Sequence, residues 1–210
     1  MKYKIILTIF CFFLLSTKNL TFANVNDNLV GNSLSFDGLD DKVVLPAMDL
    51  NSEFIIGTWG LISSDLSIFG DILSIGPYSL ALNAVNGDWN NNEIDISPPF
   101  VKYSLNHSNS SNGWYDPIIG LVETGQWHYI VATYSNELAK LYIDGQMVGQ
   151  KDMPNINIDG AIWIGDRDFG SSFSYNFNGN MSQLGIWDRE LSQDEILIQM
   201  LSEVPNFETN

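Results

Sequence analysis

The segment with the greatest catalytic potential runs from residue 93 to residue 97 and has the sequence EIDIS. Alternate residues of a β-strand face the same side, so Glu93 and Asp95 would present their carboxyl groups together. A retaining glycoside hydrolase uses two carboxyl groups about 5–5.5 Å apart, as nucleophile and as acid/base. The next residue on the same side is Ser97, and Pro98 follows it, so neither supplies a further carboxyl group as proton donor. General acid catalysis typically contributes about 10²–10⁴-fold, so we expect no catalytic residues, with Glu93 and Asp95 kept as the alternative.

Other catalytic arrangements are poorly supported by residue type and spacing. The chain has two histidines, His107 and His128, and their separation does not match the short spacing of a zinc-binding pair. The single cysteine, Cys11, lies in an apolar N-terminal stretch. We find no Gly-x-Ser-x-Gly turn and no glycine-rich phosphate loop. These observations favour a protein that binds rather than one that catalyses.

The charge of the chain restricts its partners. Among 210 residues there are 25 acidic and 9 basic side chains, giving a formal net charge of −16. Nucleic-acid binding needs a basic surface, and so does docking on anionic lipid, so both are excluded as main functions. Hydrophobic residues make up 45% of the chain, enough for a packed core. We therefore expect one acidic globular domain that is a monomer.

Residues 1–23 are predicted to be a secretory signal peptide. Lys2 and Lys4 precede an apolar stretch, Ile5 to Leu15, that is too short to cross a bilayer. Ala23 is small enough for the cleavage site, so the mature chain would begin at Asn24 without any cysteine. We expect a secreted, extracellular or periplasmic protein, with no further stretch long enough to span a membrane. Its stability would then depend on its core and on any bound metal rather than on disulfides.

The rest of the chain predicts short strands separated by turns. Asp144-Gly145 is the strongest turn signal, because a type I′ hairpin needs positive φ at both central residues. Many strands at short spacing favour a β-sandwich or barrel. The predicted strands are 34–36, 42–45, 54–62, 71–75, 78–84, 93–97, 101–105, 118–122, 128–134, 138–143, 146–150, 162–164 and 183–187. The stretches 83–92 and 106–113, rich in Asn and Ser, are predicted to be long loops.

One helix is expected near the C-terminus. Ser192 and Glu195 have the spacing of a capping box. In such a box the serine side chain accepts a hydrogen bond from the backbone N–H of the glutamate, and the glutamate side chain accepts one from the backbone N–H of the serine. Ile196, Leu197, Met200 and Leu201 follow at helical spacing, and Pro205 comes after them. Residues 205–210 are predicted to be a loose tail.

Three segments together resemble the laminin-G-like branch of the concanavalin A-like lectin/glucanase superfamily. They have the sequences LSFDGLDDKVVLP at 34–46, TGQWHYIVATYSNELAKLYIDGQMVG at 124–149, and IGDRDFGSSFSYNFNGNMSQLGIWDRELSQDEI at 164–196. The resemblance implies an all-β jelly-roll sandwich of two antiparallel sheets over residues 24–204, with one short C-terminal helix. It also implies that Trp127 packs in the core, and we expect the same of the other strand tryptophans, Trp59, Trp163 and Trp187.

The resemblance implies a function outside the cell. Its members commonly bind glycans or proteins there, so a non-catalytic binding module for carbohydrate or a cell-surface partner is the first hypothesis. The segment EIDIS also resembles the Glu-x-Asp-x-Glu strand of laminarinase- and agarase-type glycosidases, which share the superfold. This resemblance implies Glu93 as the nucleophile and Asp95 as its modulator, with Ser97 and Pro98 in the two places open to the acid/base. A glycoside hydrolase that lacks its acid/base is therefore the second hypothesis. A structural or adhesive surface protein is the third.

Calcium is the cofactor that the resemblance implies. In related jelly rolls a calcium ion often ties the N-terminal strand to the C-terminal one. Asp37 matches the acid of the family's Phe-Asp-Gly motif, and Gly179 could offer its carbonyl. Ser182 stands where the family usually has Asp, and Asp40 and Asp41 could replace that carboxylate. Carboxylate and carbonyl oxygens are the ligands that calcium prefers.

Aromatic side chains in loops are the candidates for contact with sugars, because sugar rings stack on aromatic faces. We select Trp89 beside Asn90–Asn92, Trp114 and Tyr115 beside Asp116, and Tyr175 in a Gly/Ser-rich loop. Loops positioned by a rigid scaffold often carry binding residues.

Overall fold

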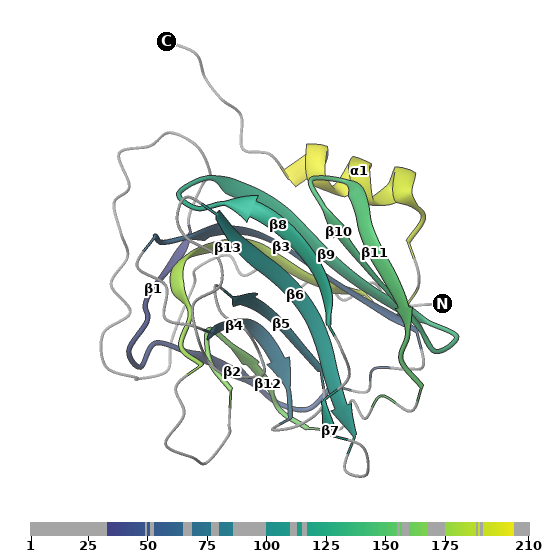
Figure 1. The fold of residues 1–210 in the computed structure, drawn as a ribbon, viewed down its shortest axis with the longest axis horizontal. Helices are drawn as coiled ribbons and strands as arrows, with labels where there is room; N and C mark the ends of the chain where they lie inside the picture. The colour runs from purple at the N-terminus through teal and green to yellow at the C-terminus, as the bar shows by residue number, and fades with distance from the viewer. Residues whose placement is uncertain are drawn as a thin grey trace.

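In the computed structural model, the described residues form a two-layered β-sandwich with one helix on its outside (Figure 1). The structure describes residues 33–48, 50, 53–64, 69–76, 80–85, 100–109, 113–114, 117–154, 156, 160–167, 175–187, 189 and 191–203. Within these ranges, no helix is long and apolar enough to cross a membrane.

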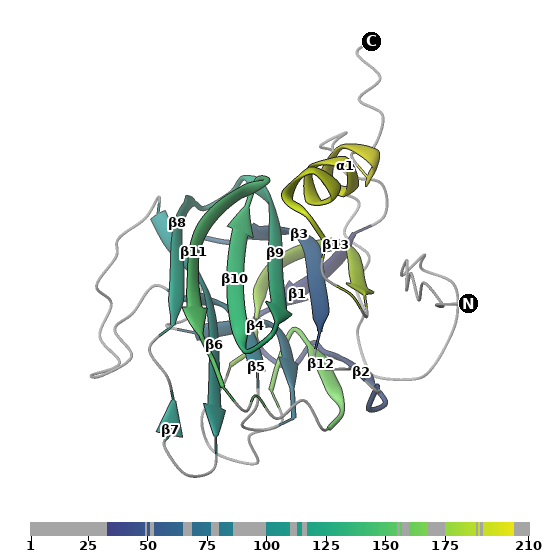
Figure 2. The same ribbon diagram turned by 90° about the vertical axis from the view of Figure 1, so that its right-hand side faces the viewer.

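The strands form two antiparallel sheets that face each other (Figure 2). The six-stranded sheet has the order β1-β13-β3-β9-β10-β11, and the seven-stranded sheet has the order β2-β12-β4-β5-β6-β7, with β8 also paired to β6. The first sheet consists of β1 (Leu34–Asp37), β3 (Phe54–Ile62), β9 (Trp127–Ser135), β10 (Leu138–Ile143), β11 (Gln146–Asp152) and β13 (Asn178–Trp187). The second consists of β2 (Val43–Leu45), β4 (Phe69–Ile75), β5 (Leu80–Val85), β6 (Phe100–Asn109), β7 (Gly113–Trp114), β8 (Ile118–Glu123) and β12 (Ile162–Ile164).

The main core fills the space between the two sheets. Strand alternation directs every second side chain inward, and these are almost all apolar. In β5, for example, Leu80, Leu82 and Ala84 are buried in this core, which leaves Ala81, Asn83 and Val85 on the outer face. Each sheet therefore has an inner face against the core and an outer face directed away from it.

A second apolar cluster lies on the outer face of the six-stranded sheet, under helix α1 (Gln193–Glu203). Leu191 and Ile196 from the helix region pack against side chains of β3, β9, β10 and β13. The sheet residues of this cluster are Ile55, Tyr129, Val131, Tyr142 and Trp187, with Trp59 and Met200 partly buried against it. The strands under α1 are therefore apolar on both faces.

The predicted turn and helix cap are confirmed. Asp144 and Gly145 have φ values of 51° and 75°, as a type I′ turn between β10 and β11 requires. The Ser192 hydroxyl accepts a hydrogen bond from the backbone N–H of Glu195 (3.3 Å), and the Glu195 carboxylate accepts one from the N–H of Ser192 (2.9 Å). The fold class, a jelly-roll sandwich with one C-terminal helix, is also confirmed.

Some predicted boundaries are wrong. Residues 106–109, predicted to be loop, continue β6, and Asn109 pairs with Gly113 of β7. Strand β13 begins at Asn178 rather than at Gln183, because its first residues pair with β1 and β3 before a bulge between Ser182 and Gly185. The predicted strand 93–97 lies outside the described residues.

Candidate functional site

A row of polar side chains crosses the outer face of the seven-stranded sheet. Asp71 of β4 lies opposite Asn83 of β5, and Asn83 lies opposite Ser104 of β6. Asn83 donates a short hydrogen bond from its amide nitrogen to Asp71, and Ser104 donates one to Asn83 (3.2 Å). All three residues are fully buried, so their side chains have fixed positions within the protein and are not solvated surface groups.

Arg167 joins this row from the segment after β12. Its Nε lies 2.5 Å from Oδ2 of Asp71 and its Nη2 lies 3.1 Å from Oδ1, which is the two-pronged geometry that Arg and carboxylate groups favour. Both side chains are at most 1% exposed. Burial raises the pKa of Asp71, while the charge and hydrogen bonds of Arg167 oppose that rise. The pair therefore fixes the segment after β12 to β4.

Tyr175, one of the predicted sugar-contact residues, lies over this ion pair. The Arg167 guanidinium is 4.7 Å from the centre of the Tyr175 ring, and the centre of the Phe69 ring is 5.9 Å from the same point. The backbone N–H of Asp71 also donates to the carbonyl of Tyr175 (2.7 Å). Tyr175 is only partly buried, so part of an aromatic side chain with a fixed position reaches the surface of the seven-stranded sheet.

A second half-buried aromatic residue, Trp163, lies on the same outer face. Its neighbours in β12, Ile162 and Ile164, are buried in the main core, so alternation directs Trp163 outward between Val44 and Ser74. The Lys42 ammonium lies 5.4 Å from the centre of the indole ring, and it also forms an ion pair with Asp166 at 3.1 Å. The prediction that Trp163 packs in the core is therefore wrong.

The predicted calcium ligand Asp37 belongs to a group of three carboxylates in the turn after β1. One oxygen from each of Asp37, Asp40 and Asp41 lies within 4.8 Å of the others. Burial raises the pKa of Asp41; the backbone N–H of Asp37 opposes that rise, and the charges of Asp37 and Asp40 add to it. The oxygen atoms are of the type calcium prefers, but two of them already accept backbone N–H groups, from Leu39 and from Asp37 itself.

The second predicted ligand, Gly179, lies on the neighbouring strand but not directly opposite Asp37. In the β1–β13 pairing, Phe36 is opposite Gly179 and Asp37 is opposite Asn178. A Cβ atom at position 179 would lie 2.1 Å from the carbonyl oxygen of Leu61, so the close approach of β3 explains the glycine. The structure thus brings Asp37 together with Asp40 and Asp41 and places Gly179 one residue away along β13.

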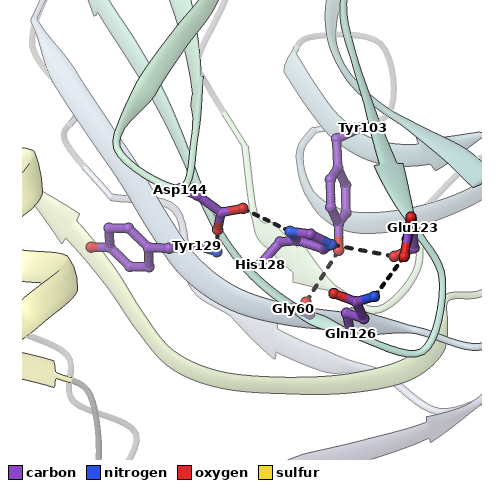
Figure 3. Close-up of polar contacts among 7 residues, drawn as sticks. All are labelled: Gly60, Tyr103, Glu123, Gln126, His128, Tyr129 and Asp144. Atoms are coloured by element: carbon purple, nitrogen blue, oxygen red, sulfur yellow. Dashed lines mark hydrogen bonds and ion pairs between the residues drawn. The ribbon is translucent and has the colours of Figure 1, made fainter.

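His128 takes part in a compact polar group at the β10–β11 turn (Figure 3). Its Nδ1 lies 2.8 Å from Oδ2 of Asp144 and its Nε2 lies 3.2 Å from the carbonyl oxygen of Glu123. Oδ1 of Asp144 accepts the backbone N–H of Tyr129 at 2.9 Å. Burial lowers the pKa of His128, but its hydrogen bond to Asp144 and that residue's charge raise it more, so the net shift is upward. Both ring nitrogens are occupied, as expected for a structural histidine rather than a metal ligand.

Trp89, Glu93, Asp95 and Tyr115 lie outside the described residues. Trp114 lies in β7, where it pairs with Ser108.

The residues that sequence reasoning missed are Trp163, Asp71 and Arg167. The alternation of Ile162, Trp163 and Ile164 was the available signal for Trp163, because three consecutive strand residues cannot all face the core. No local signal pairs Asp71 with Arg167. Trp127 is also half-buried on an outer face, opposite Leu61, so its predicted core position is wrong as well.

Comparison with protein families gives one match, to the laminin-G model Laminin_G_3, described as the concanavalin A-like lectin/glucanases superfamily. The match covers residues 78–197, which is more than half of the chain. No curated protein sequence matches the chain.

Solved structures share the fold at low sequence identity. Domain 4 of AbnA, a GH43 extracellular arabinanase from Geobacillus stearothermophilus in complex with arabinotriose, has a TM-score of 0.65 and 15% identity, over 87% of this chain and 81% of that chain. The binding domain of botulinum neurotoxin DC in complex with SialylT has a TM-score of 0.60 and 15% identity, over 88% of this chain and 44% of that chain. The binding domain of botulinum neurotoxin serotype D has a TM-score of 0.58 and 16% identity, over 84% and 45%. The chain thus spans less than half the length of these toxin chains.

Proposed function

The chain belongs to the concanavalin A-like lectin/glucanase superfamily, and on that basis we propose that it is an exported, non-catalytic carbohydrate-binding module. Two of the solved structures that share its fold are described in complex with arabinotriose and with SialylT. Because their sequence identity to this chain is low, these structures support the fold only. The proposal therefore depends on the residues of this chain.

The observation that carries the proposal is the fixed position of Tyr175. Sugar-binding sites combine an aromatic face, which covers the C–H groups of the sugar ring, with polar groups that orient its hydroxyls. Arg167 holds the Tyr175 ring from one side, and Arg167 is itself held by the buried carboxylate of Asp71. An aromatic face held in this way loses little conformational entropy on binding, which favours affinity.

Calcium is the second part of the proposal. Asp37, Asp40 and Asp41 would hold the ion through their carboxylates, and it would supply positive charge that offsets the repulsion among them. The turn that carries these residues connects β1 to β2, which belong to different sheets. We expect the bound ion to stabilise this connection.

A glycan array followed by calorimetry tests the carbohydrate proposal. We expect wild-type protein in calcium-containing buffer to bind a restricted set of glycans, and Tyr175→Ala to weaken that binding. Tyr175→Phe keeps the ring and should keep most of the affinity. Phe100→Ala is the matched control, because Phe100 is an exposed aromatic residue of the same sheet in β6.

Two results would contradict the proposal. The first is an array without any glycan bound while the protein is folded by circular dichroism. The second is a hydrolytic product released from a polysaccharide and lost in Glu93→Gln, which would favour a glycoside hydrolase instead. Capture of a protein partner together with an empty array would favour the structural or adhesive alternative.

A further inference from the structure

We propose that the exposed part of Trp163, with Val44 and the Lys42–Asp166 ion pair, forms a sugar subsite that selects uncharged glycans. This group is called the Trp163 platform below. The inference rests on the proposed carbohydrate-binding function and adds to it a location and a ligand class.

The platform has the two components that a sugar subsite needs. Trp163 is half-buried on the outer face of the seven-stranded sheet, and its cross-strand neighbour Val44 is 48% exposed, so together they offer an apolar surface. Beside them, the side chain of Lys42 is 39% exposed and that of Asp166 is 13% exposed. An apolar surface with a few fixed polar groups is the usual composition of a carbohydrate site.

The ion pair fits hydroxyl groups better than it fits a charged group. An ammonium has three N–H donors and Asp166 occupies one of them, while a carboxylate accepts several hydrogen bonds and Lys42 occupies one oxygen. The pair therefore presents donors and acceptors side by side at the surface. Each sugar hydroxyl both donates and accepts, so two neighbouring hydroxyls match this arrangement.

The platform is also held rigidly in place. The Ser74 hydroxyl donates to the carbonyl oxygen of Asp166 at 3.2 Å, and the next residue, Arg167, is fixed by Asp71. Asp166 therefore remains close to Trp163 without a ligand. Preorganised groups of this kind lose less entropy on binding than flexible ones do.

The charges around the platform disfavour acidic glycans. Among the described residues, three cations lie on this face: Lys42 and Arg167 are each paired with a carboxylate, and Lys102 of β6 alternates outward like Ser104. The three-carboxylate group continues directly into Lys42, and a Cβ atom at Gly165 would lie 3.1 Å from the carbonyl oxygen of Asp41. A sialic acid, uronate or sulfate placed on Trp163 would find the Lys42 ammonium already paired with Asp166 and three carboxylates in the turn that precedes Lys42, which disfavours such ligands.

The test uses the full mature chain on an array of neutral and acidic glycans, with titration calorimetry on the best neutral ligand. We expect neutral glycans to be bound and sialylated, sulfated and uronate-containing ones to be rejected. Trp163→Ala should weaken the binding by about thirtyfold or more, the effect of losing a central aromatic anchor. Trp127→Ala is the matched control, because Trp127 is half-buried on the outer face of the other sheet.

Asp166→Asn tests the charge argument independently of the aromatic stacking. This change frees the Lys42 ammonium, so we expect the variant to gain binding to acidic glycans. Binding restricted to acidic glycans in the wild type would overturn the ligand class, and neutral binding unaffected by Trp163→Ala would overturn the location. Both results would leave the carbohydrate-binding function standing, whereas an array with no bound glycan would contradict that function itself.

Discussion

Asp144 binds His128 and the backbone of Tyr129 with its two different oxygen atoms, at 2.8 and 2.9 Å. One carboxylate thereby ties the β10–β11 turn to β9, and His128 extends the connection to the carbonyl of Glu123 at the end of β8. The β8–β9 connection and the β10–β11 hairpin are thus linked through the imidazole of His128, which can gain or lose a proton.

We predict that this link is stronger at lower pH. The pKa of His128 is raised in the folded protein, so its contribution to stability is fully present below the ordinary value of 6.5 and is lost as pH rises through the folded value. Unfolding by urea from pH 5.5 to 9 should show this loss in wild-type protein and not in His128→Gln. His107→Gln is the control, and a pH profile unchanged by His128→Gln would contradict the prediction.

Removing one partner of the buried ion pair should be strongly destabilising. Arg167→Met leaves the Asp71 carboxylate buried without its main counter-charge, which typically costs about 3–5 kcal/mol. The double variant Asp71→Leu with Arg167→Met should recover much of that loss, since no charge remains buried. Urea unfolding curves of the two variants measure the difference, and a double variant no more stable than Arg167→Met would contradict it.

The β10–β11 turn should not tolerate a side chain at position 145. Gly145 has a φ of 75°, which costs other residues about 1–2 kcal/mol, and an added Cβ would lie 2.2 Å from Cδ2 of Leu197 in α1. We expect Gly145→Ala to lower the free energy of unfolding by more than that backbone cost. Adding Leu197→Ala should relieve the contact with the helix, beyond the cost of Leu197→Ala measured alone. Equal stability of Gly145→Ala and wild type would refute the argument.

Protonation of Glu195 should destabilise the start of α1 only well below the ordinary pKa of a glutamate. Hydrogen bonds from Arg189 and from the backbone of Ser192 lower the pKa of Glu195 to about 2 from its ordinary 4.5. Its contribution is therefore present above pH 4.5 and is lost as pH falls towards 2. The difference in stability between wild type and Glu195→Gln, followed by thermal melting, should shrink over that range. The exposed Asp194→Asn in the same turn is the control.

Calcium should raise the melting temperature if the three carboxylates hold it. An ion that binds only the folded state at 100 times its Kd stabilises that state by about 2.7 kcal/mol. We expect this gain in wild type, its reversal by a chelator, and its absence in Asp37→Asn and Asp41→Asn. Asp152→Asn, an exposed acid in β11, should behave like wild type. The same melting temperature with calcium and with chelator would remove the ion from the proposed function.

Local signals in the sequence were sufficient for the hairpin and for the helix cap. Asp144-Gly145 determines its turn through the φ values of two adjacent residues, and Ser192 and Glu195 interact across three positions. The two-sheet architecture followed from strand count and from the resemblance of three segments to a known family. Each of these features depends on neighbours in the chain or on patterns repeated along it.

The candidate site could not be predicted in the same way. Asp71 and Arg167 are 96 positions apart, and only the pairing of β12 with β4 brings them together. Trp127 was expected inside from the family resemblance and Trp163 from its place in a strand, yet the alternation of their strands places both on outer faces. Because α1 covers part of the outer face of the six-stranded sheet, that face is also apolar there. Residue type alone therefore does not show which side of the sheet a side chain faces.

The apolar cluster under α1 also has a consequence for spectroscopy. Trp59 and Trp187 belong to that cluster, and the Trp59 ring lies 5.4 Å from the ring of Tyr129. Trp163 lies on the opposite side of the sandwich beside a charged amine. In a variant that keeps only Trp59, Trp163 and Trp187 of the six tryptophans, quenching or a spectral shift of Trp59 and Trp187 would follow detachment of the helix, and a change confined to Trp163 would follow occupancy of the other face.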